Sequence, residues 1–319
     1  MGEPLLTVKN LKKYFPTKAG MLHAVDDVTF TIDEGKTLGV VGESGCGKST
    51  LGKTILRLIE PTAGEVILDG VKINELSKSQ LKKARLNMQM IFQDPYSSLD
   101  PRMSVAELIA DPLIVNRVMS GKKQIEAKVD ELMDTVGLAS RLRDAYPHEL
   151  DGGRRQRIGV ARALALDPKF IVCDEPVSAL DVSIQAQILN ILMDLKDQKG
   201  LTYIFITHDL SVVKHISDDI AVMYLGKCVE KAPSEVLFAE PKHPYTRALL
   251  AAIPVPKVEK RHSRPQIIRG EVGNPIEPKP GCRFAARCDQ CSERCLGRDI
   301  PLIETSPGHF VSCTLYEDQ

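Results

Sequence analysis

The sequence predicts an α/β fold, with a mostly parallel sheet covered by helices. Apolar runs of strand length occur at residues 38–41, 170–173 and 203–206. Between the second and third runs, Ile184, Ile188 and Leu192 recur at helical spacing. This is the strand–helix–strand crossover that joins parallel strands. Strands and helical stripes alternate in this way up to about residue 250, which is typical of a helix-covered parallel sheet.

A glycine-rich loop follows the first apolar run and fits the motif G-x-x-x-x-G-K-[ST]. Its members are Gly42, Glu43, Ser44, Gly45, Cys46, Gly47, Lys48, Ser49 and Thr50. In such a loop the backbone N–H groups surround phosphates, the lysine places its charge beside them, and the hydroxyl of Ser49 is a ligand for Mg²⁺. The apolar stripe after the loop predicts a helix that ends before Pro61, with its positive end toward the anion. Its members are Leu51, Ile55, Leu58 and Ile59. The core is therefore predicted to be a P-loop NTPase (RecA-like) core that binds a nucleoside triphosphate.

Acidic and imidazole side chains follow the other two apolar runs. Asp174 and Glu175 come directly after the second run, and His208 follows the third. Hydrolysis of a bound triphosphate needs a magnesium carboxylate, a group that polarises water and a γ-phosphate contact. Because carboxyl ends of parallel strands meet at one sheet edge, we expect Asp174 at the Mg²⁺, Glu175 at the water and His208 at the γ-phosphate.

The domain organisation follows from composition. Residues 1–253 are predicted to form the ATPase domain, with a helical subdomain at about residues 95–155, where strong strands are missing. Residues 254–319 form a C-terminal extension that starts with prolines and carries five of the eight cysteines. Lys plus Arg and Asp plus Glu both total 42, so no nucleic-acid partner is expected. With no apolar run of membrane length and no apolar leader, we expect a cytosolic chain that docks on a membrane protein.

Taken together, residues 5 to 250 resemble an ABC-transporter ATPase subunit. The resemblance implies that Gln93 is the Q-loop residue that touches Mg²⁺ and water, that residues 178–181 form the D-loop, and that His208 is the switch histidine. Phe15 is the expected aromatic that stacks on adenine, with Tyr14 as the alternative. Residues 150–157 are the signature segment, whose Asp151, Gly152 and Gly153 would contact the ATP of a second subunit.

A finer resemblance is to the ATPases of oligopeptide and dipeptide importers, and to the second, F-type subunit of the pair. Residues 92–102, 175–187 and 243–250 carry it. It implies a heterodimer with a second ATPase subunit, two membrane permeases and an extracytoplasmic peptide-binding protein. It also implies a peripheral position on the cytoplasmic face of the cell membrane. Importers of nickel or haem are the alternative substrate classes. A soluble mechanical ATPase is a further alternative, but neither a second ATPase unit nor a long coiled-coil insertion is present.

The cysteines of the extension follow the pattern C-x5-C-x6-C-x17-C, with Cys282, Cys288, Cys295 and Cys313. The same resemblance implies a [4Fe–4S] cluster on these four thiols. Four thiolates also suit tetrahedral Zn²⁺, and the remaining interpretations are unligated thiols or disulfides. Cys291 is surplus and is an alternative ligand to Cys288 or Cys295.

Two residues depart from the family signature. Asp151 stands where the pattern has Ser, and Arg154 stands where it has Gln. An ionised carboxylate cannot donate a hydrogen bond to a γ-phosphate and repels it. We therefore expect one impaired ATP site per heterodimer, with a weakly hydrolysing nucleotide switch as the alternative.

Overall fold

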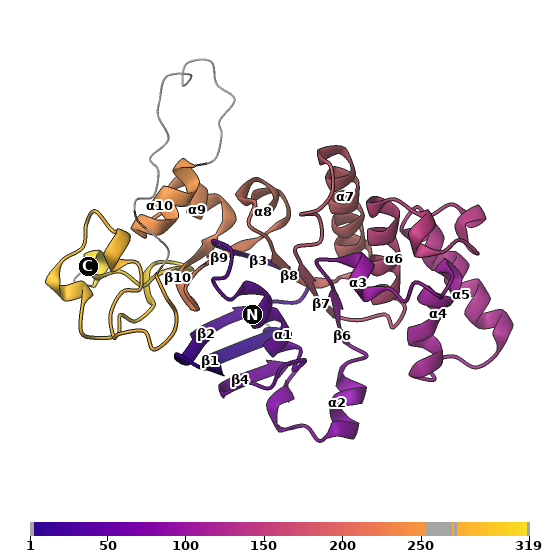
Figure 1. Cartoon of the computed structure of the whole chain (residues 1–319), viewed down its shortest axis with the longest axis horizontal. Helices are drawn as coiled ribbons and strands as arrows, with labels where there is room; N and C mark the ends of the chain where they lie inside the picture. The colour runs from indigo at the N-terminus through magenta and orange to yellow at the C-terminus, as the bar shows by residue number, and fades with distance from the viewer. Residues whose placement is uncertain (1–2, 253–269, 271–272, 318–319) are drawn as a thin grey trace, which may run out of the picture. The chain divides into compact units, whose positions relative to one another are not determined.

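The computed structural model describes residues 3–252, 270 and 273–317 (Figure 1). The chain divides into two compact units. Unit 1 combines Met1–Ile32, Thr37–Asn74 and Thr207–Gln319, and unit 2 combines Asp33–Lys36 and Glu75–Ile206. These units divide the chain differently from the predicted domains. The predicted boundary at residues 253 and 254 lies outside the described residues, so the domain organisation stays a prediction.

Unit 1 begins with an antiparallel sheet that was not predicted from the sequence. Its strand order is β2-β1-β4-β5. The strands are β1 (Leu6–Thr17), β2 (Gly20–Ile32), β4 (Ala63–Leu68) and β5 (Val71–Lys72). The register of β1 against β2 shifts three times, so the inward and outward positions of β1 do not alternate along its length. Because this irregularity hides the period-two pattern, the strand was missed.

The second group of strands in unit 1 contains the predicted strand before the P-loop and a β-hairpin. Its order is β11-β12-β10-β9-β3, with β3 parallel to β9 and the other pairs antiparallel. The strands are β3 (Thr37–Val41), β9 (Asp219–Tyr224), β10 (Lys227–Pro233), β11 (Ile303–Ser306) and β12 (His309–Val311). Strands β9 and β10 form a β-hairpin. The extension adds β11 and β12 beside β10.

The described residues of unit 1 also form helices and 3₁₀ turns. They are α1 (Lys48–Ile55), α8 (Leu210–Ile216), α9 (Ser234–Ala239), α10 (Pro244–Ala251), η5 (Ala285–Arg287), η6 (Glu293–Cys295) and η7 (Thr314–Tyr316). Helix α1 ends before Pro61, as predicted, but it already ends at Ile55, so Leu58 and Ile59 of the predicted apolar stripe lie beyond it. Arg57 has φ 50°, in the left-handed region, and the N–H groups of Leu58 and Ile59 donate to the carbonyl of Lys53. This turn leaves Leu58 47% exposed.

Unit 2 contains three parallel strands in the order β8-β7-β6, as the crossover pattern predicts. They are β6 (Met88–Ile91), β7 (Phe170–Asp174) and β8 (Thr202–Ile206). The helices are α2 (Lys78–Ala84), α3 (Pro95–Ser98), α4 (Val105–Val115), α5 (Lys122–Thr135), α6 (Gly152–Leu164) and α7 (Val182–Lys199), with 3₁₀ turns η2 (Ser140–Leu142) and η3 (Pro147–Glu149). Residues 95–155 contain no strand, and α4 and α5 pack against α6. The helical character of this region is confirmed.

Candidate active site

The glycine-rich loop connects β3 to α1, and its backbone needs glycine. Gly42 has φ 150° and Gly47 has φ 104°, in a region that L side chains rarely adopt. A Cβ on Gly47 would lie 1.9 Å from the carbonyl oxygen of Ala24, and one on Gly42 would lie 2.2 Å from that of Met223. Gly47 is also the N-cap of α1, so the loop passes directly into the positive end of the helix. The loop has the shape expected of a phosphate cradle.

Lys48 is held inside this loop. Its side chain is buried, and Nζ donates to the carbonyl oxygens of Gly42, at 2.8 Å, and Glu43, at 3.0 Å. Ser49 and Thr50 follow in the first turn of α1. The ammonium group therefore already stands within the loop, where it can be shared with an incoming phosphate.

Glu43 makes two contacts that the sequence did not predict. Its backbone N–H donates to the hydroxyl of Tyr245, at 2.9 Å. Its carboxylate accepts two hydrogen bonds from Arg287 of the extension, at 2.8 and 3.1 Å. One of the loop's N–H groups is thus engaged by the protein itself. No local pattern could reveal these partners, because they lie 202 and 244 residues away in the chain.

The two candidate adenine-stacking residues lie side by side on β1. The Tyr14 ring stacks on His23, with ring centroids 3.9 Å apart, and its hydroxyl donates to Asp26 at 2.5 Å. Burial and the bond to Asp26 raise the pKa of Tyr14 above its usual range. Phe15 is half-buried, with the Lys13 ammonium 4.7 Å from its ring centroid. Adjacent strand residues face opposite sides, and Tyr14 is already stacked within the protein, so Phe15 remains the better candidate.

In unit 2 the structure brings together the predicted water-polarising and Q-loop residues. Parallel pairing of β6 with β7 puts the ends of both strands at one edge. There the amide of Gln93 donates to a carboxylate oxygen of Glu175, at 3.0 Å. Asp174 ends β7 and is 2% exposed, whereas Glu175 has φ 45°, a left-handed conformation that is rare outside glycine. Such backbone strain is typical of functional positions.

His208 belongs to unit 1, immediately before α8. The N–H of neighbouring Thr207 donates to the carbonyl of Val40 in β3, at 3.2 Å. Val40 lies two residues before Gly42. His208 therefore directly follows Thr207, whose backbone is hydrogen-bonded to β3, the strand that precedes the P-loop. Joining the unit 1 residues to Gln93, Asp174 and Glu175 in one site stays a prediction.

The signature segment starts α6, and Asp151 is its N-cap. One Asp151 carboxylate oxygen accepts from the backbone N–H of Arg154, at 2.8 Å, and the other lies 3.5 Å from the Arg154 guanidinium. The Asp151 side chain is 59% exposed. The Arg155 guanidinium lies over the Tyr96 ring, 5.3 Å from its centroid. The carboxylate thus caps the helix as Ser would and remains open to solvent.

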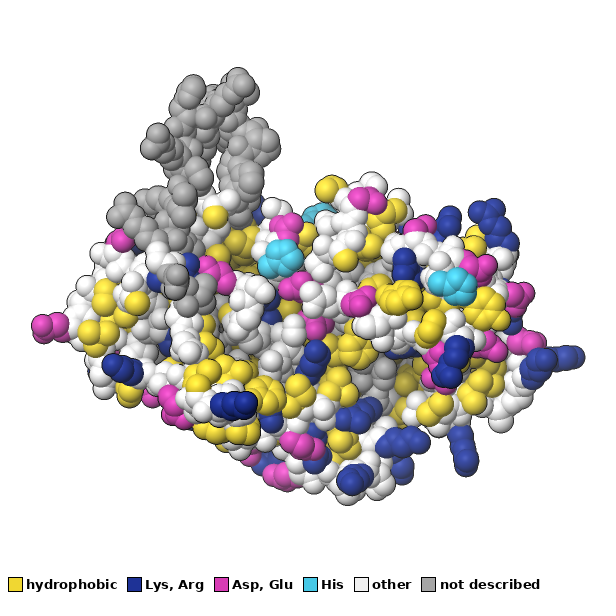
Figure 2. Space-filling model, viewed as in Figure 1, with side chains coloured by type: hydrophobic (Ala, Val, Ile, Leu, Met, Phe, Trp, Pro, Cys, Tyr) yellow, Lys and Arg dark blue, Asp and Glu magenta, His cyan; other side chains and the backbone are white. Residues whose placement is uncertain are grey.

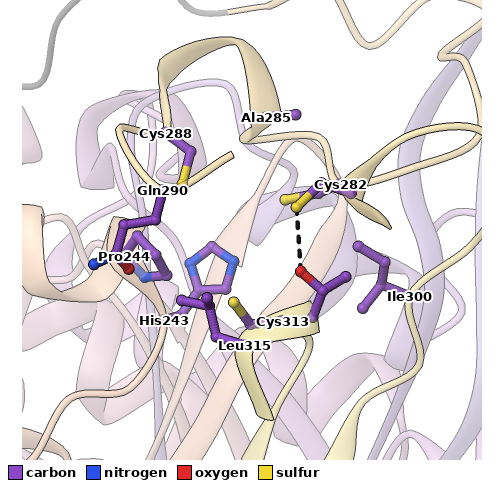
Figure 3. Close-up of a pocket in the computed structure, with 11 residues that line it drawn as sticks. His243, Pro244, Cys282, Ala285, Cys288, Gln290, Ile300, Cys313 and Leu315 are labelled. Carbon is purple, nitrogen blue, oxygen red and sulfur yellow. Dashed lines mark hydrogen bonds between the residues drawn. The ribbon is translucent and has the colours of Figure 1, made fainter. Parts of the chain in front are cut away.

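The four predicted cysteines of the extension line one pocket (Figure 3). Figure 3 shows the sulfur atoms of Cys282, Cys288 and Cys313 around a common space, close to His243. Burial raises the pKa of the Cys282 thiol to about 11 and raises that of Cys313 as well. Although burial opposes it, hydrogen bonds from the Ser292 backbone and the Thr314 hydroxyl lower the pKa of Cys295.

The metal-binding part of the sequence prediction has no support from the arrangement of ligands. Within the part of the chain that is described, no group of three or more His, Cys, Asp or Glu side chains is positioned to hold a metal ion. The donor chemistry fits a soft metal, because all four predicted thiols face one pocket and Cys291 does not line it.

Comparison with known proteins decides the family. A family model described as "ABC transporter" matches residues 25–178, and one described as "Oligopeptide/dipeptide transporter, C-terminal region" matches residues 229–295. Over 317 residues the chain is 50% identical to a putative oligopeptide transport ATP-binding protein, YkfD, of Bacillus subtilis, covering 99% of this chain and 96% of that protein. The chain belongs to the ABC transporter family. This ABC subunit is also 50% identical to the oligopeptide transport ATP-binding protein OppF of Bacillus subtilis, covering 98% of this chain and 97% of that one.

The fold of the ABC subunit is likewise that of the family. A solved dimeric ATP-binding cassette in a post-hydrolysis state, bound to ADP and Pi, matches with a TM-score of 0.67 and 30% identity. The match covers 72% of this chain and 98% of that chain. The predicted P-loop NTPase fold and the predicted ATP-hydrolysing activity are confirmed. None of the helices among the described residues is long and apolar enough to span a lipid bilayer.

Proposed function

We propose that the chain is the ATP-hydrolysing subunit that powers peptide import through a membrane transporter. The observation that carries this proposal is its identity, at about half of all positions and over nearly its full length, to oligopeptide transport ATP-binding proteins. The similarity includes the C-terminal region of oligopeptide and dipeptide transporters, which other ABC cassettes need not share. The geometry of the P-loop supports the binding of the triphosphate.

Each site residue has a distinct part in hydrolysis. The P-loop amides and Lys48 hold the phosphates, and Ser49 and Asp174 would hold Mg²⁺, which would stabilise charge on the transferred phosphoryl group. Glu175 orients and deprotonates the attacking water, while His208 contacts the γ-phosphate. In the structure the amide of Gln93 donates a hydrogen bond to Glu175. We infer that this hydrogen bond gives way when ATP binds, which releases the carboxylate toward water; the freed Gln93 amide would then be a further ligand for Mg²⁺.

The partners follow from the same proposal. Two ATPase subunits close on two ATP molecules, so that residues 151–153 of one subunit complete the site of the other. The helices of residues 95–155, together with the Gln93 loop, carry this motion to two permease subunits, which receive peptides from an extracytoplasmic binding protein. The chain itself lies on the cytoplasmic face of the cell membrane. On the face shown in Figure 2, basic and acidic side chains are interspersed, which does not favour a nucleic-acid partner.

We propose that the cysteine pocket holds a [4Fe–4S] cluster, with Zn²⁺ as the alternative occupant. Cys282, Cys288, Cys295 and Cys313 would be the ligands, and such a group would cross-link a segment with little core of its own. Anaerobically purified protein should contain metal that is lost in Cys313→Ser but retained in Cys291→Ser. Iron with sulfide identifies the cluster, and zinc alone identifies the alternative. Absence of both metals would reject the site.

The substrate is tested with the assembled transporter in liposomes. Its ATPase activity should rise when the peptide-loaded binding protein is added, and radiolabelled peptide should accumulate inside. The Lys48→Ala subunit should support neither. Stimulation and uptake with nickel or haem but not with peptide would assign the subunit to the neighbouring importers of the same branch.

A further inference from the structure

An arginine of the C-terminal extension, Arg287, contacts the P-loop. Both terminal nitrogens of Arg287 donate to the carboxylate of Glu43, at 2.8 and 3.1 Å, and form a bidentate ion pair. The Arg287 side chain is 6% exposed and that of Glu43 is 24% exposed. This pair is therefore shielded from the solvent screening that weakens surface pairs.

Aromatic side chains hold Arg287 in place. Its guanidinium lies 5.9 Å from the ring centroids of both Tyr224 and Phe284, and it donates to the Tyr224 hydroxyl at 3.3 Å. Phe284 is 3% exposed and packs edge-on against Tyr224, with ring centroids 5.3 Å apart. The arginine is thus fixed by the extension's own attachment to the ATPase core.

Tyr245 holds the other side of Glu43. Its hydroxyl accepts from the Glu43 N–H, and its ring packs against Tyr224, with centroids 4.6 Å apart. Glu43 is therefore held by both its backbone and its carboxylate. We call Arg287, Tyr245 and Glu43 the P-loop clamp. All three lie in unit 1.

The P-loop clamp reduces the repulsion expected between the Glu43 carboxylate and the phosphates of ATP. Glu43 is a carboxylate within a loop that receives a polyphosphate, and like charges repel. The carbonyl of the same residue accepts from Lys48, at 3.0 Å, so a shift of Glu43 also moves the contact of the phosphate-binding ammonium. Arg287 neutralises the carboxylate and fixes its direction.

We propose that Arg287 is a positioning residue for the P-loop, through which the C-terminal extension sets the affinity for ATP. This inference rests on the proposed role of the P-loop in ATP binding. The clamp touches no reacting atom, so it acts on nucleotide affinity and KM and leaves kcat of the ATP-saturated transporter nearly unchanged.

The test measures the affinity of the full-length chain for a fluorescent ATP analogue with Mg²⁺. We expect Arg287→Ala to raise Kd about tenfold, which corresponds to about 1.4 kcal/mol. Arg287→Lys keeps the charge but loses the planar fork, so its Kd should lie between those of Arg287→Ala and the wild type. Arg298→Ala is the matched control, because Arg298 also pairs with a carboxylate, that of Glu317, within the extension. The Arg298→Ala chain should bind ATP with the affinity of the wild type.

A double-mutant cycle separates positioning from a general structural effect. In the Glu43→Gln background the carboxylate charge is gone, so Arg287→Ala should weaken ATP binding far less than it does in the wild type. Normal affinity of Arg287→Ala, or an equal loss in both backgrounds, would overturn the proposal. If Arg287→Ala does not fold, the same cycle with Arg287→Lys decides. Lys48→Ala tests separately the proposed function on which this inference rests. If Lys48→Ala binds ATP normally, the role of the P-loop in ATP binding is rejected.

Discussion

The hydrogen bond between Gln93 and Glu175 holds the carboxylate that we propose as the catalytic base. Glu175 has a left-handed backbone, and its carboxylate is held at 3.0 Å by an amide from the end of the neighbouring strand. Non-glycine residues in this conformation cost on the order of 1–3 kcal/mol, which the surrounding structure must offset. The strain turns the side chain at Glu175 away from the direction that a continuing strand would give it.

Glu175→Gln should retain ATP binding and lose turnover. The neutral amide has nearly the same shape, so the ligands of the phosphates remain, but it cannot accept the proton of the attacking water. ATPase activity of the assembled transporter should fall by roughly 10²–10⁴-fold, with little change in nucleotide affinity. Glu235→Gln, an exposed change at the start of α9, is the control. Turnover at the wild-type rate would show that another group serves as the base.

At the scale of elements, a buried carboxylate joins the extension to the core. Glu230 of β10 is fully buried and accepts from the N–H groups of Lys242 and His243, at 2.7 and 2.9 Å. Nε2 of His309, in β12, donates to the same carboxylate at 2.7 Å. Burial opposes ionisation, but these hydrogen bonds prevail and lower the pKa of Glu230. The bond from His309 therefore connects β12, a strand of the extension, to the sheet.

The free energy of unfolding should decrease at acidic pH because of Glu230 and its neighbour His243. Burial lowers the pKa of His243 from 6.5 to about 4, so the unfolded chain binds a proton between these values that the folded chain excludes. The unfolding free energy should fall as pH drops from 6.5 to about 4, the interval between the two pKa values of His243. Below the usual pKa of a glutamate, Glu230 adds to the loss, because its stabilising charge is removed as pH approaches its lowered pKa. Urea denaturation across this range tests the expectation, and a flat profile contradicts it.

His309→Ala tests the same contact directly. It leaves a buried carboxylate without one of its donors, at a cost of about 3 kcal/mol or more at neutral pH. The exposed His215→Ala in α8 is the control and should have little effect. An equal, small loss in both variants, measured by urea denaturation, would show that the Glu230–His309 contact contributes little.

At the scale of the whole molecule and its assembly, Asp151 predicts two unequal ATP sites. The chain's own P-loop, Glu175 and His208 are all present, so the site they form with a partner's ordinary signature should hydrolyse ATP. The site that combines the partner's P-loop with Asp151 places an exposed carboxylate where a hydroxyl donor is expected. Glu175→Gln in this chain should therefore stop transport, while the matching change in the partner should be milder.

Asp151→Ser is the complementary change. Serine is also a good N-cap, so the start of α6 should persist, and the change isolates the effect of the charge. ATPase activity should rise or stay the same. A collapse of activity in Asp151→Ser, together with equal losses from both glutamate changes, would show that Asp151 is an adapted part of a working site.

The sequence alone determined the features that depend on neighbours in the chain. The P-loop, the strand that ends in Asp174 and the helical character of residues 95–155 were predicted because spacing and turn chemistry act over a few residues. The four cysteines of the predicted pattern line one pocket, but the metal site predicted for them has no support among the described residues.

Tertiary structure decided the features that join distant segments. The first antiparallel sheet was missed because the register shifts of β1 hide its periodicity. Helix α1 ends early because Arg57 turns into the left-handed region. The contact of Arg287 with Glu43 spans 244 residues, and local periodicity carries no information about a contact formed only when the extension packs its aromatic side chains on the core.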